Sequence, residues 1–313
     1  MQDWFGARTF DSGDFSVADL ARRKAALGHT VSVVLPARNE DQTIAGVVSA
    51  CATLAGTLVD ELVVLDGDSD DDTAELAAQA GARVHTDAQV LPEYGPPLGK
   101  GDALWRSLSV TSGDVVVFVD TDIRNPDPHF VWGLLGPLLH DPAVQLVKAF
   151  YDRPLEVGER LHPTGGGRVT ELMARPLLNA FWPELAGLVQ PLSGEYAARR
   201  ELLELLPFFT GYGVEIGLLI DTLRVAGADA IAQVDLSTRV HRNQSLEALS
   251  RMAFGILQVA LRRLSDAERA HFTAAVPTGY TQFYRDVSAI ATETHDLPVV
   301  ERPAHATRAQ PTG

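Results

Sequence analysis

The chain has 313 residues, enough for one large α/β domain with an extension or for two closely joined lobes. Its 46% hydrophobic and 21% charged residues exclude a wholly disordered, collagen-like or coiled-coil chain. The formal net charge of −15 repels phosphate backbones, so we expect no nucleic-acid partner.

Short apolar runs alternate with helical patterns between residues 30 and 150. The pattern predicts strands over 30–36, 61–66, 82–86, 114–120 and 144–151, and helices over 41–54, 72–80, 100–110 and 128–139. The strands are continuously apolar, which is typical of strands buried on both faces. We therefore predict an α/β fold with a mainly parallel sheet flanked by helices, and a ligand site beyond the carboxyl ends of the strands.

The second half of the chain has a different pattern. A Gly-rich loop, HPTGGGR, precedes a helix-like segment over 168–182, a strand-like segment over 188–198, helices over 199–206 and 214–225, a strand over 230–236 and a long helix over 246–264. No linker rich in Pro, Gly and Ser separates the halves, so the boundary near residue 150 is soft. We expect an N-terminal extension (1–29), two halves of one domain (30–150 and 151–265) and a C-terminal extension (266–313) with a disordered end.

The sequence carries no signal for export or membrane insertion. No run of about 18 apolar residues occurs, and the N-terminal segment MQDWFGARTFDSGDF is acidic where a signal peptide is basic and then apolar. The single cysteine, Cys51, cannot form an intrachain disulfide, and its apolar neighbours predict a core position. These features favour a cytoplasmic protein without a membrane partner.

Asp120, Thr121 and Asp122 follow directly after the predicted strand DVVVFVD, at the edge where a ligand crevice is expected. Two carboxylates placed there must be neutralised, and Mg²⁺ or Mn²⁺ bridging them to a diphosphate would do so. The alternative is a turn or helix cap. Two other strands also end in polar segments: LPARNE, which suits a nucleotide, and DGDSDDD, of which we expect only the first part to face a ligand because the rest caps a helix.

Isolated charged residues give weaker signals. Lys100 lies in a Pro/Gly-bounded loop that opens a helix, and Gly165–Arg168 offers N–H groups and a guanidinium suited to a phosphate or carboxylate. Glu215 lies on an apolar helix. Burying its carboxylate without a partner would be costly, so a position facing a cleft is favoured over one in the core. For Lys100 alone a solvated surface charge, and for His241 alone a structural role, would be the simpler interpretation.

Taken together, these segments resemble a known family. VSVVLPARNE, VVLDGDSDDDT, LGKGDALW and VVFVDTDIRN are similar to the GT-A class of nucleotide-sugar-dependent glycosyltransferases. In the second half, GGGRVTELMARPLLNAFWPELAGLVQPLSGEYAARR, TGYGVEIGLL and VHRNQS resemble the glucosyl-3-phosphoglycerate synthases of actinobacteria and their mannosyl relatives.

The resemblance implies roles for individual residues. The nucleotide pocket would comprise Pro36, Ala37, Arg38, Glu40, Gly67 and Lys100, with Asp120 and Thr121 near the ribose and diphosphate. The metal ligands would be Asp122 and His241, and the acceptor site would comprise Gly167, Arg168, Val169, Thr170 and Asn243. The residues with catalytic roles would be Asp122, Lys100, Thr170 and Glu215, the last of which orients the donor sugar.

The implied activity is metal-dependent transfer of glucose from UDP-glucose to the 2-hydroxyl of 3-phosphoglycerate, with retention of configuration, by a cytoplasmic homodimer. The product would be a precursor of methylglucose polysaccharide or a compatible solute. Transfer of mannose from GDP-mannose is the alternative that the same fold allows. Three other classes of protein are less consistent with the sequence. An inverting transferase acting on a polyprenyl phosphate would need a membrane anchor, and a nucleotidyltransferase would carry a Gly-rich signature where this chain has PARNE. A binding module without activity would not need all of the polar site residues together.

Overall fold

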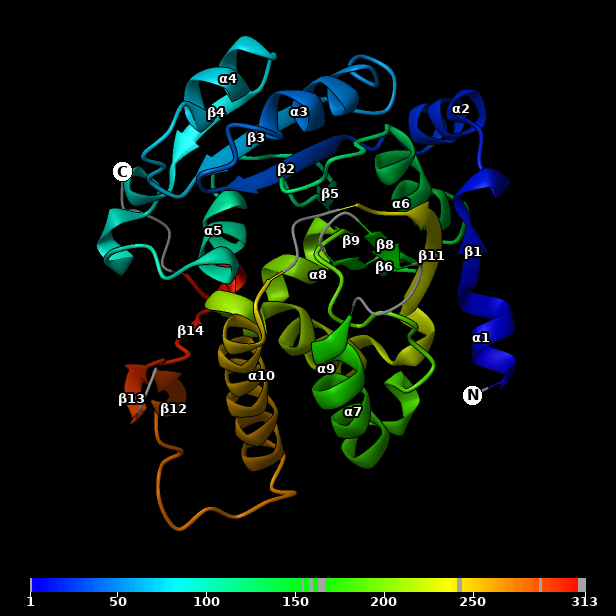
Figure 1. Cartoon of the computed structure of the whole chain (residues 1–313). Coiled ribbons are helices and arrows are strands. Elements are labelled where there is room, and N and C mark those ends of the chain that lie inside the picture. The colour runs from blue at the N-terminus through cyan, green and yellow to red at the C-terminus, as the bar shows by residue number, and fades with distance from the viewer. Residues whose placement is uncertain are drawn as a thin grey trace.

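The structure is a computed structural model and describes residues 2–153, 155–157, 160–162, 167–240, 244–286 and 289–308. Its largest sheet has eight strands (Figure 1). In spatial order they are β1 (Thr9–Asp11), β11 (Ile231–Thr238), β6 (Leu146–Asp152), β9 (Tyr196–Arg199), β5 (Val115–Phe118), β2 (Val31–Ala37), β3 (Glu61–Asp66) and β4 (Arg83–Thr86). All neighbours are parallel except β9, which runs antiparallel to both β5 and β6. The predicted mainly parallel sheet is confirmed.

Helices cover both faces of this sheet (Figure 1). On one face, α2 (Val17–Leu27), α3 (Ile44–Ala52), α4 (Thr73–Gln79) and α6 (His129–His140) close one apolar core. On the other face, α5 (Lys100–Ser107), α7 (Arg175–Phe181), α8 (Arg200–Leu205), α9 (Val214–Ala226) and α10 (Leu246–Asp266) close a second core. Strands β2 and β5 contribute to both cores because their side chains alternate between two buried faces.

The two ends of the chain add elements that periodicity did not predict. At the N-terminus, α1 (Gln2–Arg8) leads into β1, which extends the main sheet at its edge. At the C-terminus, β12 (Gly279–Asp286) and β13 (Ala289–Asp296) form a hairpin beside α10, and β14 (Glu301–Arg302) pairs with β10 (Phe208–Phe209). A further short hairpin joins β7 (Leu155–Val157) to β8 (Arg160–His162). The end predicted to be disordered lies outside the described residues.

Three predicted elements differ from the structure. Of the strand predicted over 188–198, only β9 forms; the preceding residues make turns around Pro191, which has no N–H to donate. The helix-like segment 168–182 contains a π-helical turn, Thr170–Ala174, before α7, where Pro176 cannot donate back to the preceding turn. The helix predicted over 100–110 ends at Ser107.

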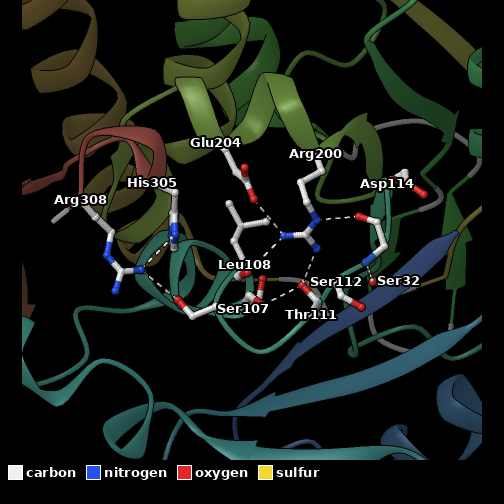
Figure 2. A network of polar contacts seen from close by, with 12 residues as sticks. Ser32, Ser107, Leu108, Thr111, Ser112, Asp114, Arg200, Glu204, His305 and Arg308 are labelled. Atoms are coloured by element: carbon white, nitrogen blue, oxygen red, sulfur yellow. Dashed lines mark hydrogen bonds and ion pairs between the residues drawn. The ribbon is translucent and has the colours of Figure 1, made fainter. Parts of the chain in front are cut away.

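A polar network fixes the segment between α5 and β5 (Figure 2). The Arg200 guanidinium on α8 donates to the carbonyl oxygens of Leu108 and Gly113 and to the Thr111 hydroxyl, at 2.6 to 3.1 Å. Because β5 begins two residues after Gly113, this network positions the strand that carries the Asp-Thr-Asp segment. Cys51 is buried as predicted, and burial raises the pKa of its thiol to about 12. In the part of the chain that the structure describes, no helix is long and apolar enough to cross a bilayer.

Candidate active site

A cavity of about 660 Å³ opens at the carboxyl ends of the sheet strands. It is lined by every described residue that the sequence predicted for the site: Pro36, Ala37, Arg38, Glu40, Gly67, Lys100, Asp120, Thr121, Asp122, Gly167, Arg168, Val169, Thr170 and Glu215. The two remaining predicted residues, His241 and Asn243, lie outside the described residues. The lining comes from both halves of the chain, so one cavity can hold two substrates at once.

The loops after β2 and β3 are bonded to each other. The Asn39 backbone N–H donates to the Ser69 hydroxyl at 2.9 Å, and the Asp70 backbone N–H donates to the Asn39 side-chain oxygen at 2.9 Å. Of the acidic run after β3, Gly67 and Asp68 line the cavity, whereas Asp71 accepts hydrogen bonds from Thr73 at the start of α4. The first part of this run faces the cavity and a later aspartate serves the helix, as predicted.

Lys100 joins two carboxylates of different origin. Its ammonium lies 2.6 Å from Asp120 Oδ1, after β5, and 2.9 Å from Glu215 Oε1, in the first turn of α9. Burial opposes the charge of Lys100, but the two carboxylates raise its pKa well above the ordinary value. Burial alone would raise the pKa of Asp120. The positive charges of Lys100 and Arg239 outweigh this effect and lower that pKa to about 2. Lys100 and Asp120 are therefore both ionised at neutral pH.

Arg239, just after β11, was not predicted from the sequence. One of its terminal nitrogens lies 2.6 Å from Asp122 Oδ1 and 3.1 Å from Asp120 Oδ2, and its Nε lies 3.0 Å from Glu195 Oε1. Arg239 and Glu195 are both buried, and their pairing keeps each charge compensated. Arg239 thereby holds both aspartates of the Asp-Thr-Asp segment in place.

Two glycines allow the backbone to approach these charged groups closely. A Cβ at Gly194 would lie 2.0 Å from Asp120 Oδ2, and a Cβ at Gly101 would lie 2.0 Å from the carbonyl oxygen of Phe209. Only glycine fits at either position. Gly194 packs directly against the Asp120 carboxylate, and Gly101 lets α5 pack against the turn that precedes α9.

Two arginines from the second half of the chain also line the cavity. Arg168 donates to the Gln244 carbonyl oxygen at 2.9 Å, and Arg153 donates to the Tyr151 hydroxyl at 2.8 Å. Both arginines line the cavity, and Thr170 beside Arg168 is buried. Two guanidinium groups here suit a small anion carrying phosphate or carboxylate groups.

The donor set near β5 fits a hard divalent cation. Asp120, Asp122, Glu195 and Glu215 gather around the two cations Lys100 and Arg239 in these ion pairs. Asp122 lines the cavity, and carboxylate oxygen is the ligand that Mg²⁺ and Mn²⁺ prefer. Among the described residues, no three His, Cys, Asp or Glu side chains form a metal cluster by themselves.

The fold and the cavity can now be compared with known proteins. The model of the family described as glycosyl transferase family 2 matches residues 32–205. The chain belongs to this family. It is 47% identical over 304 residues to the glucosyl-3-phosphoglycerate synthase of Mycolicibacterium smegmatis, with 97% of each chain covered. The family predicted from the sequence motifs is thus confirmed.

Solved structures extend this similarity to the fold. The mannosyl-3-phosphoglycerate synthase of Rubrobacter xylanophilus superposes with a TM-score of 0.90 at 43% identity, covering 98% of this chain and 97% of that one. The glucosyl-3-phosphoglycerate synthase of Mycobacterium tuberculosis was solved with Mn²⁺, UDP-glucose and phosphoglyceric acid. It superposes with a TM-score of 0.82 at 48% identity, and the match covers 93% of this chain and 95% of that one. The predicted GT-A-type α/β fold is confirmed by these neighbours.

Proposed function

We propose that the chain is a metal-dependent glycosyltransferase that moves glucose from UDP-glucose to the 2-hydroxyl of 3-phosphoglycerate. One observation carries the proposal: a single cavity is lined both by the Asp-Thr-Asp segment with Lys100 and by Arg168 and Arg153. The first group suits a sugar-nucleotide diphosphate, and the second suits a phosphorylated acid. The relatives at 47–48% identity, which bear the name of this activity and whose structures hold these substrates, support it.

The charge and position of each residue indicate its role in the proposed reaction. Lys100 lies where it can offset the negative charge that develops on the departing diphosphate, and Arg239 keeps Asp120 and Asp122 oriented toward the same group. Glu215 anchors the Lys100 ammonium and lies at the cavity wall, where it can accept a hydrogen bond from a sugar hydroxyl. Arg168, Gly167, Val169 and Thr170 hold the acceptor so that its hydroxyl reaches the reacting carbon.

Asp122 and His241 would hold the divalent metal together with diphosphate oxygens. When bound, Mg²⁺ or Mn²⁺ supplies Lewis-acid stabilisation of the leaving diphosphate. The Mycobacterium tuberculosis relative is solved with either ion, which supports this choice. The reaction proceeds with retention: the acceptor hydroxyl attacks from the face that the diphosphate leaves and passes its proton to that diphosphate. No separate strong base is then required.

Mannose transfer from GDP-mannose is the second candidate. It is favoured by the similarity to the Rubrobacter xylanophilus synthase, whose name specifies mannose. Both reactions would use the same acceptor end of the cavity, so they differ only in the donor. Both substrates of either reaction are intracellular metabolites, in keeping with a cytoplasmic enzyme that supplies methylglucose polysaccharide or compatible-solute synthesis.

The proposal is tested by nucleoside diphosphate release. The purified chain is given UDP-glucose or GDP-mannose, each with and without 3-phosphoglycerate, and each in Mg²⁺ or excess EDTA. We expect release from UDP-glucose that requires both 3-phosphoglycerate and metal. Faster release from GDP-mannose would support the second candidate, and release that does not depend on 3-phosphoglycerate would contradict the assigned acceptor.

A further inference from the structure

One buried carboxyl on the cavity wall has no partner in the network described above. Asp87, which directly follows β4, is 3% exposed and lines the cavity. Its Oδ1 is buried and accepts no hydrogen bond from the described residues. Asp102, a buried carboxylate on the neighbouring helix α5, is by contrast bonded to Arg302, Arg106 and the Leu98 N–H. A buried polar atom without a partner is costly, which indicates that a ligand supplies the partner of Asp87.

The position of Asp87 along the sheet indicates which part of a ligand reaches it. The proposed diphosphate and metal site lies at the end of β5, and the order from there is β5, β2, β3, β4. Asp87 therefore follows the strand that lies three positions along the sheet from β5, in the direction away from β6 and β11. A nucleoside diphosphate that is held at β5 and extends past the loops after β2 and β3 would present its base toward β4. The cavity wall in this region also includes Leu65, Pro96, Pro97 and Ala103, which suit the flat faces of a base.

The edges of the two candidate bases differ in a way that a carboxyl distinguishes. Uracil presents one ring N–H between two carbonyl oxygens, whereas guanine presents a ring N–H beside an amino group. An ionised carboxylate only accepts hydrogen bonds, so its two oxygens match the two donors of guanine. A protonated carboxyl accepts with one oxygen and donates with the other, so it matches the N–H and adjacent carbonyl of uracil.

We propose that Asp87 binds the nucleobase of the donor and sets the choice between uridine and guanosine donors. This inference rests on the proposed function, because it takes the nucleotide site at β5 as given. Asp87 is thus a specificity-determining residue, because its carboxyl, and not the diphosphate site, distinguishes a uridine donor from a guanosine donor.

The surroundings of Asp87 let both protonation states occur near neutral pH. Burial, and then the negative charge of Asp102, raise the pKa of Asp87 to about 7, while Arg106 opposes them. Asp66, the last residue of β3, and Asp68, just beyond it, add to the rise. Below this pKa the carboxyl matches uracil, and above it the carboxylate matches guanine. The preference for uridine is therefore expected to weaken as the pH rises.

The test uses binding of UDP and GDP, measured by calorimetry with Mg²⁺ on the full chain. Asp87→Asn keeps the shape but fixes one acceptor and one donor, so it mimics the protonated form. We expect it to raise the ratio Kd(GDP)/Kd(UDP) at pH 8 by about tenfold or more. The ratio should also lose its pH dependence between pH 6 and 8. Asp70→Asn is the matched control: Asp70 is exposed and outside the cavity, and the substitution removes the same charge.

The outcomes separate this inference from the proposed function. If Asp87→Asn leaves the ratio unchanged, or changes it no more than Asp70→Asn does, Asp87 does not read the base. Loss of all binding in Asp87→Asn, with a lowered melting temperature, would identify it as a structural residue and overturn the inference. If the wild-type chain releases UDP as proposed, either failure leaves the proposed function intact. If the wild type binds neither nucleotide, the proposed function itself fails.

Discussion

At the scale of single residues, Asp122 is the carboxylate whose loss tests the metal site most directly. It lines the cavity and is held by Arg239 at 2.6 Å. We expect Asp122→Ala to lower kcat/KM at least about a hundredfold, or about 2.7 kcal/mol, because it removes stabilisation of the leaving group. Asp127→Ala, an exposed aspartate of the same post-strand segment, should remain close to wild type. Activity of Asp122→Ala within about tenfold of wild type would contradict the assignment.

Arg168 tests the acceptor end. Its guanidinium lines the cavity beside Thr170, and the phosphate or carboxylate of 3-phosphoglycerate would bind it. Arg168→Ala should therefore raise the KM for 3-phosphoglycerate far more than the KM for UDP-glucose, since only the acceptor loses a partner. Initial rates with each substrate varied in turn measure both constants. Equal changes in the two constants would remove Arg168 from the acceptor site.

Lys148 is a buried cation whose titration should affect stability. Its ammonium donates to the Ser193 carbonyl oxygen at 2.5 Å and lies 4.5 Å from the centre of the Tyr196 ring. Burial lowers its pKa to about 7, whereas in the unfolded chain it stays near 10.4. Between these two values the unfolded chain binds the extra proton, so the free energy of unfolding contributed by Lys148 rises with pH.

Comparison of wild type with Lys148→Met isolates this contribution. We expect the free energy of unfolding of the wild type, relative to the variant, to increase from pH 7 to pH 9 in urea titrations. Arg22→Met serves as a control, because the Arg22 side chain is 72% exposed and pairs with Asp19 at the molecular surface. A relative stability that stays flat or falls over this range would show that Lys148 remains charged in the folded state.

At the scale of elements, the C-terminal segment braces the helix that carries Lys100. Arg302, in β14, donates two hydrogen bonds of 2.7 Å to the carboxylate of Asp102 on α5, and both residues are buried. Arg302→Leu leaves Asp102 with fewer partners for a buried charge, so we expect the free energy of unfolding to fall by about 3 kcal/mol. Urea denaturation monitored by tryptophan fluorescence measures this, since Trp105 packs in the same helix.

A neighbouring pair provides the control for Arg302. Arg262 lies 2.8 Å from Glu301 but is 48% exposed, so Arg262→Leu should cost at most about 1 kcal/mol. Similar losses in the two variants would mean that β14 contributes through general packing and not through the Asp102 pair.

The elements also explain which features could be predicted from the sequence. Strands β2, β3 and β5 are continuous apolar runs that end in polar segments, so both the strands and the site residues after them could be predicted. Arg239 and Glu195 could not, because each is a single charged residue whose partners lie far along the chain: Arg239 pairs with an aspartate 117 residues away. Asp87 could not either, because a single aspartate after a short strand gives no signal of its own. Strand β1 has only three residues, too few for a periodic signal.

At the scale of the whole molecule, the C-terminal hairpin presents apolar surface that the other described residues leave uncovered. One face of the β12–β13 hairpin packs on α10: Gln282 is buried against Ser250 and Arg251, and Tyr280 stacks on Phe254. On the other face, Phe283 is 70% exposed and Ile290 is 65% exposed. Figure 1 shows the hairpin at the margin of the molecule, beside α10. Because a two-stranded hairpin is only marginally stable in water, this face favours a covering partner.

A second copy of the chain is the partner we propose for this face, in line with the homodimer expected from the family resemblance. With a net charge of −15, two copies repel each other, so association needs an apolar contact of this kind. We expect wild type to have twice the monomer mass of 33.7 kDa in sedimentation equilibrium, and Phe283→Ser with Ile290→Ser to be monomeric. Leu205→Ser, an exposed leucine at the end of α8, should leave the dimer intact. A wild-type monomer, or a dimer that survives the double substitution, would contradict the assignment of the hairpin as the interface.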